Sequence, residues 1–173
     1  MVYFYSAVER RSRAVIRSIF APALTAKFAG ALTLDEGDLA KSRIHATIEA
    51  NSIETRDAGR DEHLKSVDFL DVKTFPWLTF KSISIRLVRP GELAVEGDLT
   101  IRGVTREVLF DVEGPTPPEK DPWGNLRVAV SATTKISRKE FGLVWNAALE
   151  GGGILVGDDV TISLDVQFVR APA

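Results

Sequence analysis

Alternation of apolar and polar residues along the chain is the feature that most restricts its fold. It is clearest in the last long segment, which runs Val160-Thr161-Ile162-Ser163-Leu164-Asp165-Val166-Gln167-Phe168. Successive side chains of a β-strand point to opposite faces of the sheet, so this pattern is typical of a strand with one buried face. The chain is therefore expected to form a sheet with one apolar face.

The same alternation recurs along the chain and predicts about eight strands. Besides the last segment, the runs cover residues 13–20, 25–34, 43–50, 78–88, 93–101, 108–112 and 126–136. Turn-forming residues separate them, among them Arg102-Gly103, which favours a tight hairpin. Gly97 interrupts one run and indicates a bulge or a close approach by a neighbouring group. Short strands of this regularity predict one all-β domain over residues 1–173, built as an antiparallel sandwich or an up-and-down barrel.

Two segments depart from the strand pattern and predict short helices. Residues 57–69 carry many charges and are long enough for about two helical turns, although no strong cap precedes them. Residues 137–141 are expected to form a single turn, because Ser137 and Glu140 have the spacing of a capping box. One or two short helices are therefore expected to cap the sheet.

The composition excludes several kinds of chemistry. The 173 residues include no cysteine and only two histidines, His45 and His63. This excludes disulfides, thiol nucleophiles, cysteinyl zinc and multi-histidine metal sites, and we expect neither a metal nor a cofactor. The 22 basic and 24 acidic residues give a net charge of −2, which argues against binding to nucleic acid or to a charged membrane surface. The composition favours binding over catalysis.

No segment has the pattern of a targeting sequence. A signal peptide has an apolar stretch of roughly 7–15 residues after its positive charges. Here the uncharged run Val2 to Val8 precedes Arg10, Arg11 and Arg13. No apolar stretch approaches the roughly 20 residues of a membrane-spanning helix. We therefore expect a cytoplasmic protein without a membrane span.

The densest polar cluster is Arg60-Asp61-Glu62-His63-Leu64. In a catalytic interpretation, His63 is a general base oriented by Asp61 or Asp68. No Gly-x-Ser-x-Gly motif supports a hydrolase, and the spacing is not that of a metal motif. In the alternative interpretation, these residues belong to a short charged helix that covers one end of the fold. The three glycines at 151–153 lack the Lys-Ser/Thr of a phosphate loop and are expected to form a flexible connection.

Several separate motifs lie along the chain at characteristic spacing. In chain order they are Ser52-Ile53-Glu54-Thr55, Arg60-Asp61-Glu62-His63-Leu64, Ser66, Asp68-Phe69-Leu70-Asp71, Phe75-Pro76-Trp77-Leu78-Thr79-Phe80-Lys81-Ser82, Gly97-Asp98-Leu99-Thr100-Ile101-Arg102-Gly103-Val104-Thr105, Asp121-Pro122-Trp123-Gly124, Ser137-Arg138-Lys139-Glu140-Phe141-Gly142-Leu143, Trp145-Asn146 and Leu155-Val156-Gly157-Asp158. Together they resemble the YceI-like polyisoprenoid-binding family, and the resemblance covers about residues 24–170. It implies an extended, eight-stranded, antiparallel β-barrel similar to the lipocalin fold. In that family the barrel encloses an apolar pore for an isoprenoid chain, such as a polyprenyl lipid or a quinone side chain. Members are often dimers, and many are exported.

The first strand departs from the family pattern. Arg11 lies near the position of a motif histidine, and Ser18 lies where a second histidine is usual. Pro22 lies in an altered turn that follows. If those family groups contact a ligand head group, this chain is expected to prefer a different head group.

One side of each strand is expected to line the pore, because a barrel of this size can hold one small ligand. The predicted apolar lining is Phe28, Ile44, Ile48, Phe69, Phe80, Val108, Phe110, Val130, Trp145, Ile162 and Phe168. The predicted polar groups at the mouth are Arg60, His63, Arg138 and Asn146, with a purely structural role for these four as the alternative.

Three functions follow from these observations. The first is a non-enzymatic protein that carries or sequesters an isoprenoid-type lipid, possessing no catalytic residues. The second is an enzyme acting on a small hydrophobic substrate in the same cavity, which requires a perturbed Asp, Glu or His pointing into it. The third is an interaction domain whose core is filled by aromatic side chains, because buried rings serve a core as well as a cavity wall.

Overall fold

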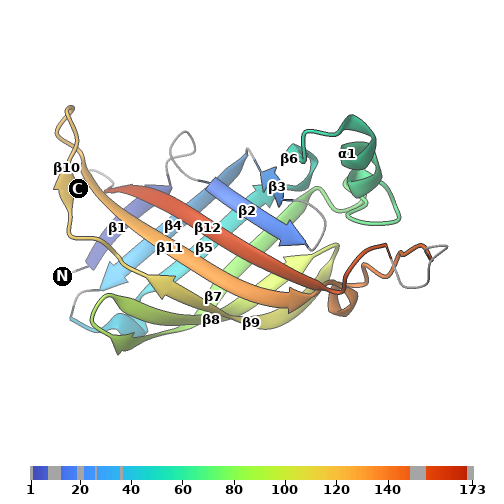
Figure 1. Cartoon of the computed structure of the whole chain (residues 1–173). Coiled ribbons are helices and arrows are strands. Elements are labelled where there is room, and N and C mark those ends of the chain that lie inside the picture. The colour runs from blue at the N-terminus through green and yellow to red at the C-terminus, as the bar shows by residue number, and fades with distance from the viewer. Residues whose placement is uncertain are drawn as a thin grey trace.

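The computed structural model describes residues 2–7, 13–18, 22–25, 27–35, 37–148 and 155–170, with side chains described from residue 27 onward. The chain folds into a long antiparallel sheet that curls around an apolar interior (Figure 1). Its strands are β1 (Val2–Ala7), β2 (Arg13–Ser18), β3 (Pro22–Thr25), β4 (Phe28–Asp35), β5 (Arg43–Glu49), β6 (Ile53–Glu54), β7 (Trp77–Arg89), β8 (Glu92–Ile101), β9 (Val104–Glu113), β10 (Glu119–Lys120), β11 (Leu126–Ser137) and β12 (Asp159–Arg170).

The strand order of the sheet is β10-β11-β9-β8-β7-β5-β4-β1-β12-β2-β3-β6. An additional pairing of β11 with β12 joins two strands that stand far apart in this order. The described pairings are all antiparallel, and β12 lies beside both β1 and β2. The expectation of an antiparallel, mostly β fold is confirmed.

The N-terminal strands differ most from expectation. The strand predicted over residues 25–34 corresponds to β4 from Phe28 onward, while Thr25 is the last residue of a separate strand, β3. The strand predicted over residues 13–20 corresponds to β2, Arg13–Ser18. The short strands β1, β6 and β10 were not predicted. Arg11 and the glycines at 151–153 lie outside the described residues, and Ser18 is described only by its place in β2.

Arg102 and Gly103 form the predicted hairpin between β8 and β9. Both have positive φ angles, 50° and 73°, which matches the right-handed twist of paired strands. The Arg102 guanidinium donates to the carbonyl oxygens of Val67 at 2.7 Å and Gly142 at 3.0 Å. This side chain therefore ties the hairpin to two loops at the same end of the sheet.

Gly97 shows both features expected of it. The register between β7 and β8 shifts between Ser82 and Ser84, opposite Gly97, so β7 has a bulge there. A Cβ atom at Gly97 would lie 2.6 Å from Cζ of Phe80 and 2.5 Å from the carbonyl oxygen of Lys81. Only glycine fits this close approach.

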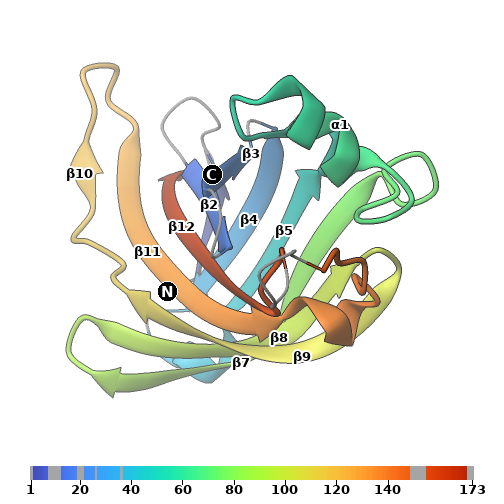
Figure 2. The same ribbon diagram turned by 45° about the vertical axis from the view of Figure 1, so that its right-hand side comes forward.

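The helix α1 (Ala58–Lys65) covers one end of the sheet, which we call the α1 end (Figure 2). The expectation that it lacks a strong cap is wrong, because the Asp57 side chain accepts from the Arg60 backbone N–H at 2.9 Å. Short 3₁₀ turns cover residues 39–41, 50–52 and 138–141. The last is the predicted single turn, although the Ser137 side chain makes no capping hydrogen bond.

The interior is apolar along its length. Along β8, Val95, Leu99 and Ile101 are buried, and Asp98 between them is exposed. Two clusters of buried side chains form the core, a large one and a smaller one around Leu32 and Phe168. Within the described part of the chain, the single helix is too short and too polar to cross a membrane.

Candidate ligand-binding cavity

The interior of the sheet contains a cavity of about 580 Å³. Its wall includes side chains from both core clusters, from Val95 and Leu99 on β8 to Leu32 and Phe168 at the other end. The interior is therefore not filled by side chains. The third interpretation from the sequence, an interaction domain with an aromatic-filled core, is wrong.

The predicted apolar lining agrees with this wall except at one position. Ten of the eleven residues line the cavity, from Phe28 to Phe168, whereas Val108 does not. Val108 pairs with Gly97, beside which the Phe80 ring lies, and packs against the large core cluster instead. Because an aromatic ring covers the sheet at this point, the alternation of β9 alone does not predict which residues reach the cavity.

Other lining residues share the alternation of their strands but were not singled out from the sequence. They include Leu32, Leu34, Leu78, Ile85, Leu93, Val95, Leu99, Ile101, Val112, Ile136, Leu164 and Val166. Seven of them follow the same two-residue period as a predicted lining residue of their strand. Ile85 does not, because the β7 bulge shifts the period after Phe80. The other four lie on β8, from which no lining residue was predicted.

An aromatic cluster of His63, Phe69 and Trp145 lines the cavity at the α1 end. The His63 ring lies edge-on to Trp145 at 4.4 Å and to Phe69 at 5.0 Å between ring centroids. The Phe69 and Trp145 rings are 5.4 Å apart. The three rings therefore form a connected aromatic part of the cavity wall at this end.

Of the two carboxylates proposed as partners of His63, Asp68 is the one in contact. Its Oδ2 lies 3.1 Å from His63 Nε2. Asp61 instead accepts from the backbone N–H of Thr55 at 2.7 Å and from its hydroxyl at 2.5 Å. The Thr55 hydroxyl bond is the main cause that holds the pKa of Asp61 below its usual value.

Arg60 lies at the cavity rim on the first turn of α1. Its Nε donates to the Thr55 hydroxyl at 2.9 Å, and Nη2 approaches the Thr55 carbonyl oxygen at 3.5 Å. Asp61 fixes Thr55 in turn. The guanidinium is thus held by Thr55 beside the cavity.

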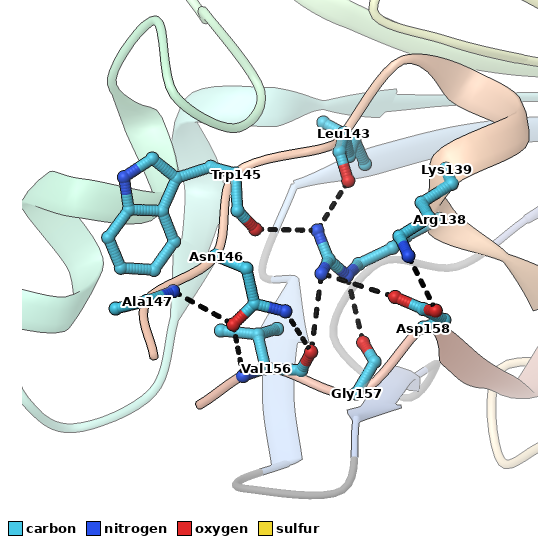
Figure 3. A network of polar contacts seen from close by, with 9 residues as sticks. All are labelled: Arg138, Lys139, Leu143, Trp145, Asn146, Ala147, Val156, Gly157 and Asp158. Atoms are coloured by element: carbon cyan, nitrogen blue, oxygen red, sulfur yellow. Dashed lines mark hydrogen bonds and ion pairs between the residues drawn. The ribbon is translucent and has the colours of Figure 1, made fainter. Parts of the chain in front are cut away.

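Arg138 lies in the cavity wall with 3% of its surface exposed, and its bonds go to the surrounding chain (Figure 3). Nη1 donates to the carbonyl oxygens of Leu143 and Trp145, the latter at 2.8 Å. Its remaining partners are the carbonyl oxygens of Gly157 and Val156 and the carboxylate of Asp158. A guanidinium has five N–H donors, and these contacts use all five.

Asn146 does not line the cavity. Its Nδ2 donates to the Val156 carbonyl oxygen at 2.6 Å, and its Oδ1 accepts from the backbone N–H groups of Val156 and Ala147, each at 2.9 Å (Figure 3). This side chain joins the segment after Trp145 to the segment before β12.

The carboxylates with shifted pKa values lie away from the cavity. The nearby charge of Glu96 on β8 raises the pKa of Glu107 on β9. Burial opposes ionisation of Asp121, yet bonds from Asn125 and Arg127 hold its pKa well below the usual range. Neither these two nor Asp61 lines the cavity, and the described residues include no group of three or more metal-ligating side chains.

An antiparallel sheet around an apolar cavity, with aromatic and cationic groups at one end, defines a β protein with an internal pocket. The sequence of the YceI-like domain matches residues 11–168, so the chain belongs to the YceI-like family. UPF0312 protein SA2479 of Staphylococcus aureus (strain N315) is 37% identical over 134 residues, which are 78% of this chain and 75% of that protein.

Solved structures show the same fold. BcnA of Burkholderia cenocepacia superposes with a TM-score of 0.79 at 21% identity, over 93% of this chain and 98% of that one. A polyisoprenoid-binding domain from Saccharophagus degradans superposes with a TM-score of 0.62 at 11% identity, over 99% of this chain and 100% of that one.

Proposed function

We propose that this protein binds one isoprenoid-type amphiphilic lipid in its cavity, and carries or sequesters it without chemical change. The observation that carries the proposal is the cavity itself, about 580 Å³ and lined mainly by aliphatic and aromatic side chains. This volume lies within the roughly 300–1,000 Å³ typical of small-molecule sites. The description of the Saccharophagus degradans domain as polyisoprenoid-binding supports the choice of ligand class.

Apolar burial supplies the binding energy. Each CH₂ group moved from water into such a cavity gains about 0.8 kcal/mol, so a chain of a dozen carbons gains roughly 10 kcal/mol before the costs of association. Such a ligand needs few polar contacts. Its selection then depends on the length and width of the cavity.

The head group of the ligand is proposed to lie at the α1 end. Arg60 and His63 both line the cavity there, and Arg60 offers N–H donors. Arg138 and Asn146 are assigned a structural role instead, because their polar atoms bind the backbone around Trp145 and Val156. The ten apolar lining residues from Phe28 to Phe168 are proposed to contact the chain of the lipid.

A lipocalin-like barrel of eight strands is the architecture proposed for this container. The pairing of β11 with both β9 and β12 supports it, as does the pairing of β12 with β1. In this arrangement β1 with β2, and β3 with β4, each count as one interrupted strand. The homodimer, the cytoplasmic location and the single domain over residues 1–173 stay predictions.

Catalysis is the second candidate, and the placement of the titratable groups disfavours it. Among the described residues, the three carboxylates with shifted pKa values do not face the cavity. Of the two histidines that line the cavity, His63 is the one in contact with a carboxylate, that of Asp68. A binding function uses every feature of the cavity without requiring a reactive group.

Native mass spectrometry of the purified protein, followed by titration with geranylgeraniol, tests the proposal. We expect a one-to-one complex. Val130→Trp places a large ring in the cavity wall and should abolish binding, whereas Leu109→Trp on the exposed outer face should not. A folded wild-type protein that retains no lipid and binds no geranylgeraniol contradicts the proposal, as does equal binding by the two variants.

A further inference from the structure

The length of the cavity suits an extended ligand, and the inference made below rests on the proposed function. Lining residues extend along β12 from Val160 to Phe168. Eight steps of a strand cover about 26 Å. An extended chain in the cavity can therefore contact lining residues of several strands along its length, among them Phe80 on β7.

The position of the Phe80 ring in the cavity wall depends on a glycine. Gly97 lies midway along β8, and the Phe80 ring from β7 lies directly beside it. We call the space left by the absent Gly97 side chain the Gly97 notch. With any Cβ at that position the ring would have to move, because the gap to Cζ would be only 2.6 Å. The ring thus lies against the wall instead of across the cavity.

A second ring fixes this position. Phe110 on β9 meets Phe80 edge-to-face, with centroids 5.1 Å apart and planes at 74°. Both rings line the cavity. The bulge of β7 between Ser82 and Ser84 lies opposite Gly97, on the strand that carries Phe80. Three neighbouring strands therefore hold the Phe80 ring at one depth.

We infer that Phe80, held in the Gly97 notch by Phe110, sets the width limit of the cavity. At Phe80 the cavity then admits a single linear isoprenoid chain and excludes rigid fused rings and paired acyl chains. Phe80 is in this view the residue that determines specificity for the shape of the ligand, while the remaining wall contributes apolar contact.

The test compares two alcohols of similar polarity and different width: geranylgeraniol, which is a linear chain, and cholesterol, which has rigid fused rings. Wild-type protein should bind geranylgeraniol at least tenfold more tightly. Phe80→Ala widens the cavity at the notch and should bring the two affinities within about threefold. Phe168→Ala is the matched control, because it removes the same side chain from another part of the lining. It should weaken both probes and keep the tenfold ratio.

Two further variants distinguish a change in the width of the cavity from a folding defect in Phe80→Ala. Phe80→Leu is milder than Phe80→Ala and should lower the ratio in the same direction. Gly97→Ala should act in the opposite sense, pushing the ring inward and weakening geranylgeraniol binding by tenfold or more in the folded fraction. An unchanged ratio in folded Phe80→Ala or Phe80→Leu overturns the inference alone, as does an equal loss of ratio in Phe168→Ala. Failure of wild-type protein to bind either probe overturns the proposed function and this inference with it.

Discussion

The guanidinium of Arg138 donates from Nη1 to the carbonyl oxygen of Trp145 at a distance of 2.8 Å. A buried cation thereby holds the backbone of the residue whose ring contacts His63 and Phe69. The same guanidinium reaches Gly157 and Asp158, so the two segments that flank residues 147–155 are joined through one side chain.

Loss of this guanidinium should destabilise the protein severely. Arg138→Met leaves several buried carbonyl oxygens without donors, and we expect the free energy of unfolding to fall by about 3–5 kcal/mol. Urea denaturation measures the change. Lys139→Met is the control, since its ammonium is half exposed and pairs with Asp158 at the surface, and it should change stability by about 0.5 kcal/mol or less. Equal effects of the two substitutions would show that Arg138 does not hold the wall.

Trp145 should slow the escape of a bound ligand. Trp145→Ala removes one ring of the aromatic cluster and opens the α1 end of the cavity. We expect the dissociation rate of geranylgeraniol to rise about tenfold, which corresponds to about 1.4 kcal/mol. Stopped-flow exchange into excess vesicles measures this rate. Trp123→Ala removes an indole that is 72% exposed outside the cavity and should leave the rate unchanged. A slower or unchanged rate in Trp145→Ala contradicts the placement of the ligand's exit at this end.

The hairpin at Gly103 should tolerate no side chain. Gly103→Ala combines a positive φ of 73° with a Cβ only 2.6 Å from the Phe75 ring, and we expect a loss of about 2–4 kcal/mol. Gly91→Ala is the control, because Gly91 has a similar positive φ of 82° but no atom lies within 4 Å of the new Cβ. It should cost about 1–2 kcal/mol, the backbone contribution alone. Chemical denaturation of both variants isolates the contact with Phe75, and equal losses would show that this contact does not matter.

Glu107→Gln should stabilise the protein at neutral pH. The charge of Glu96 raises the pKa of Glu107, so the ionised pair is less favourable in the folded state than in the unfolded chain. As the pH falls through the raised pKa toward the ordinary value of 4.5, folded Glu107 takes up its proton first and wild-type stability rises relative to the variant. The advantage of Glu107→Gln should therefore be largest near pH 7 and vanish below about pH 4.5. Denaturation at several pH values checks this, with Glu119→Gln on β10 as a neutral control. A variant less stable than wild type at pH 7 would refute the repulsion.

Alternation along the strands predicted part of the cavity wall. On β12 every second residue from Val160 to Phe168 lines the cavity, so Ile162 and Phe168 were predicted correctly as lining residues. Val108 was predicted to line the cavity and does not, because the ring beside Gly97 comes from a strand that is adjacent in space and distant in the chain. Local periodicity contains no information about such a neighbour.

Among the polar residues, too, local roles could be predicted from the sequence and long-range contacts could not. The capping role of Asp57 was available from its residue type and its position before the helix. A structural role for Arg138 was one of the two alternatives from the sequence, but its partners could not be predicted, because they lie between five and twenty residues further along the chain. Thr55 and Asp61, which position Arg60, lie within motifs that the family resemblance identified, yet only the fold shows that they bond to each other.

The pairing of β12 with β1 and β2 has a consequence for the synthesis of this protein. The first strands of the chain find one of their neighbours only in the last one, residues 159–170. During translation, residues 2–18 therefore emerge long before that partner exists. Contacts of such sequence separation slow folding and leave strand edges exposed meanwhile. The nascent chain should depend on chaperones until β12 has left the ribosome, and deletion of β12 should remove the partner of both β1 and β2.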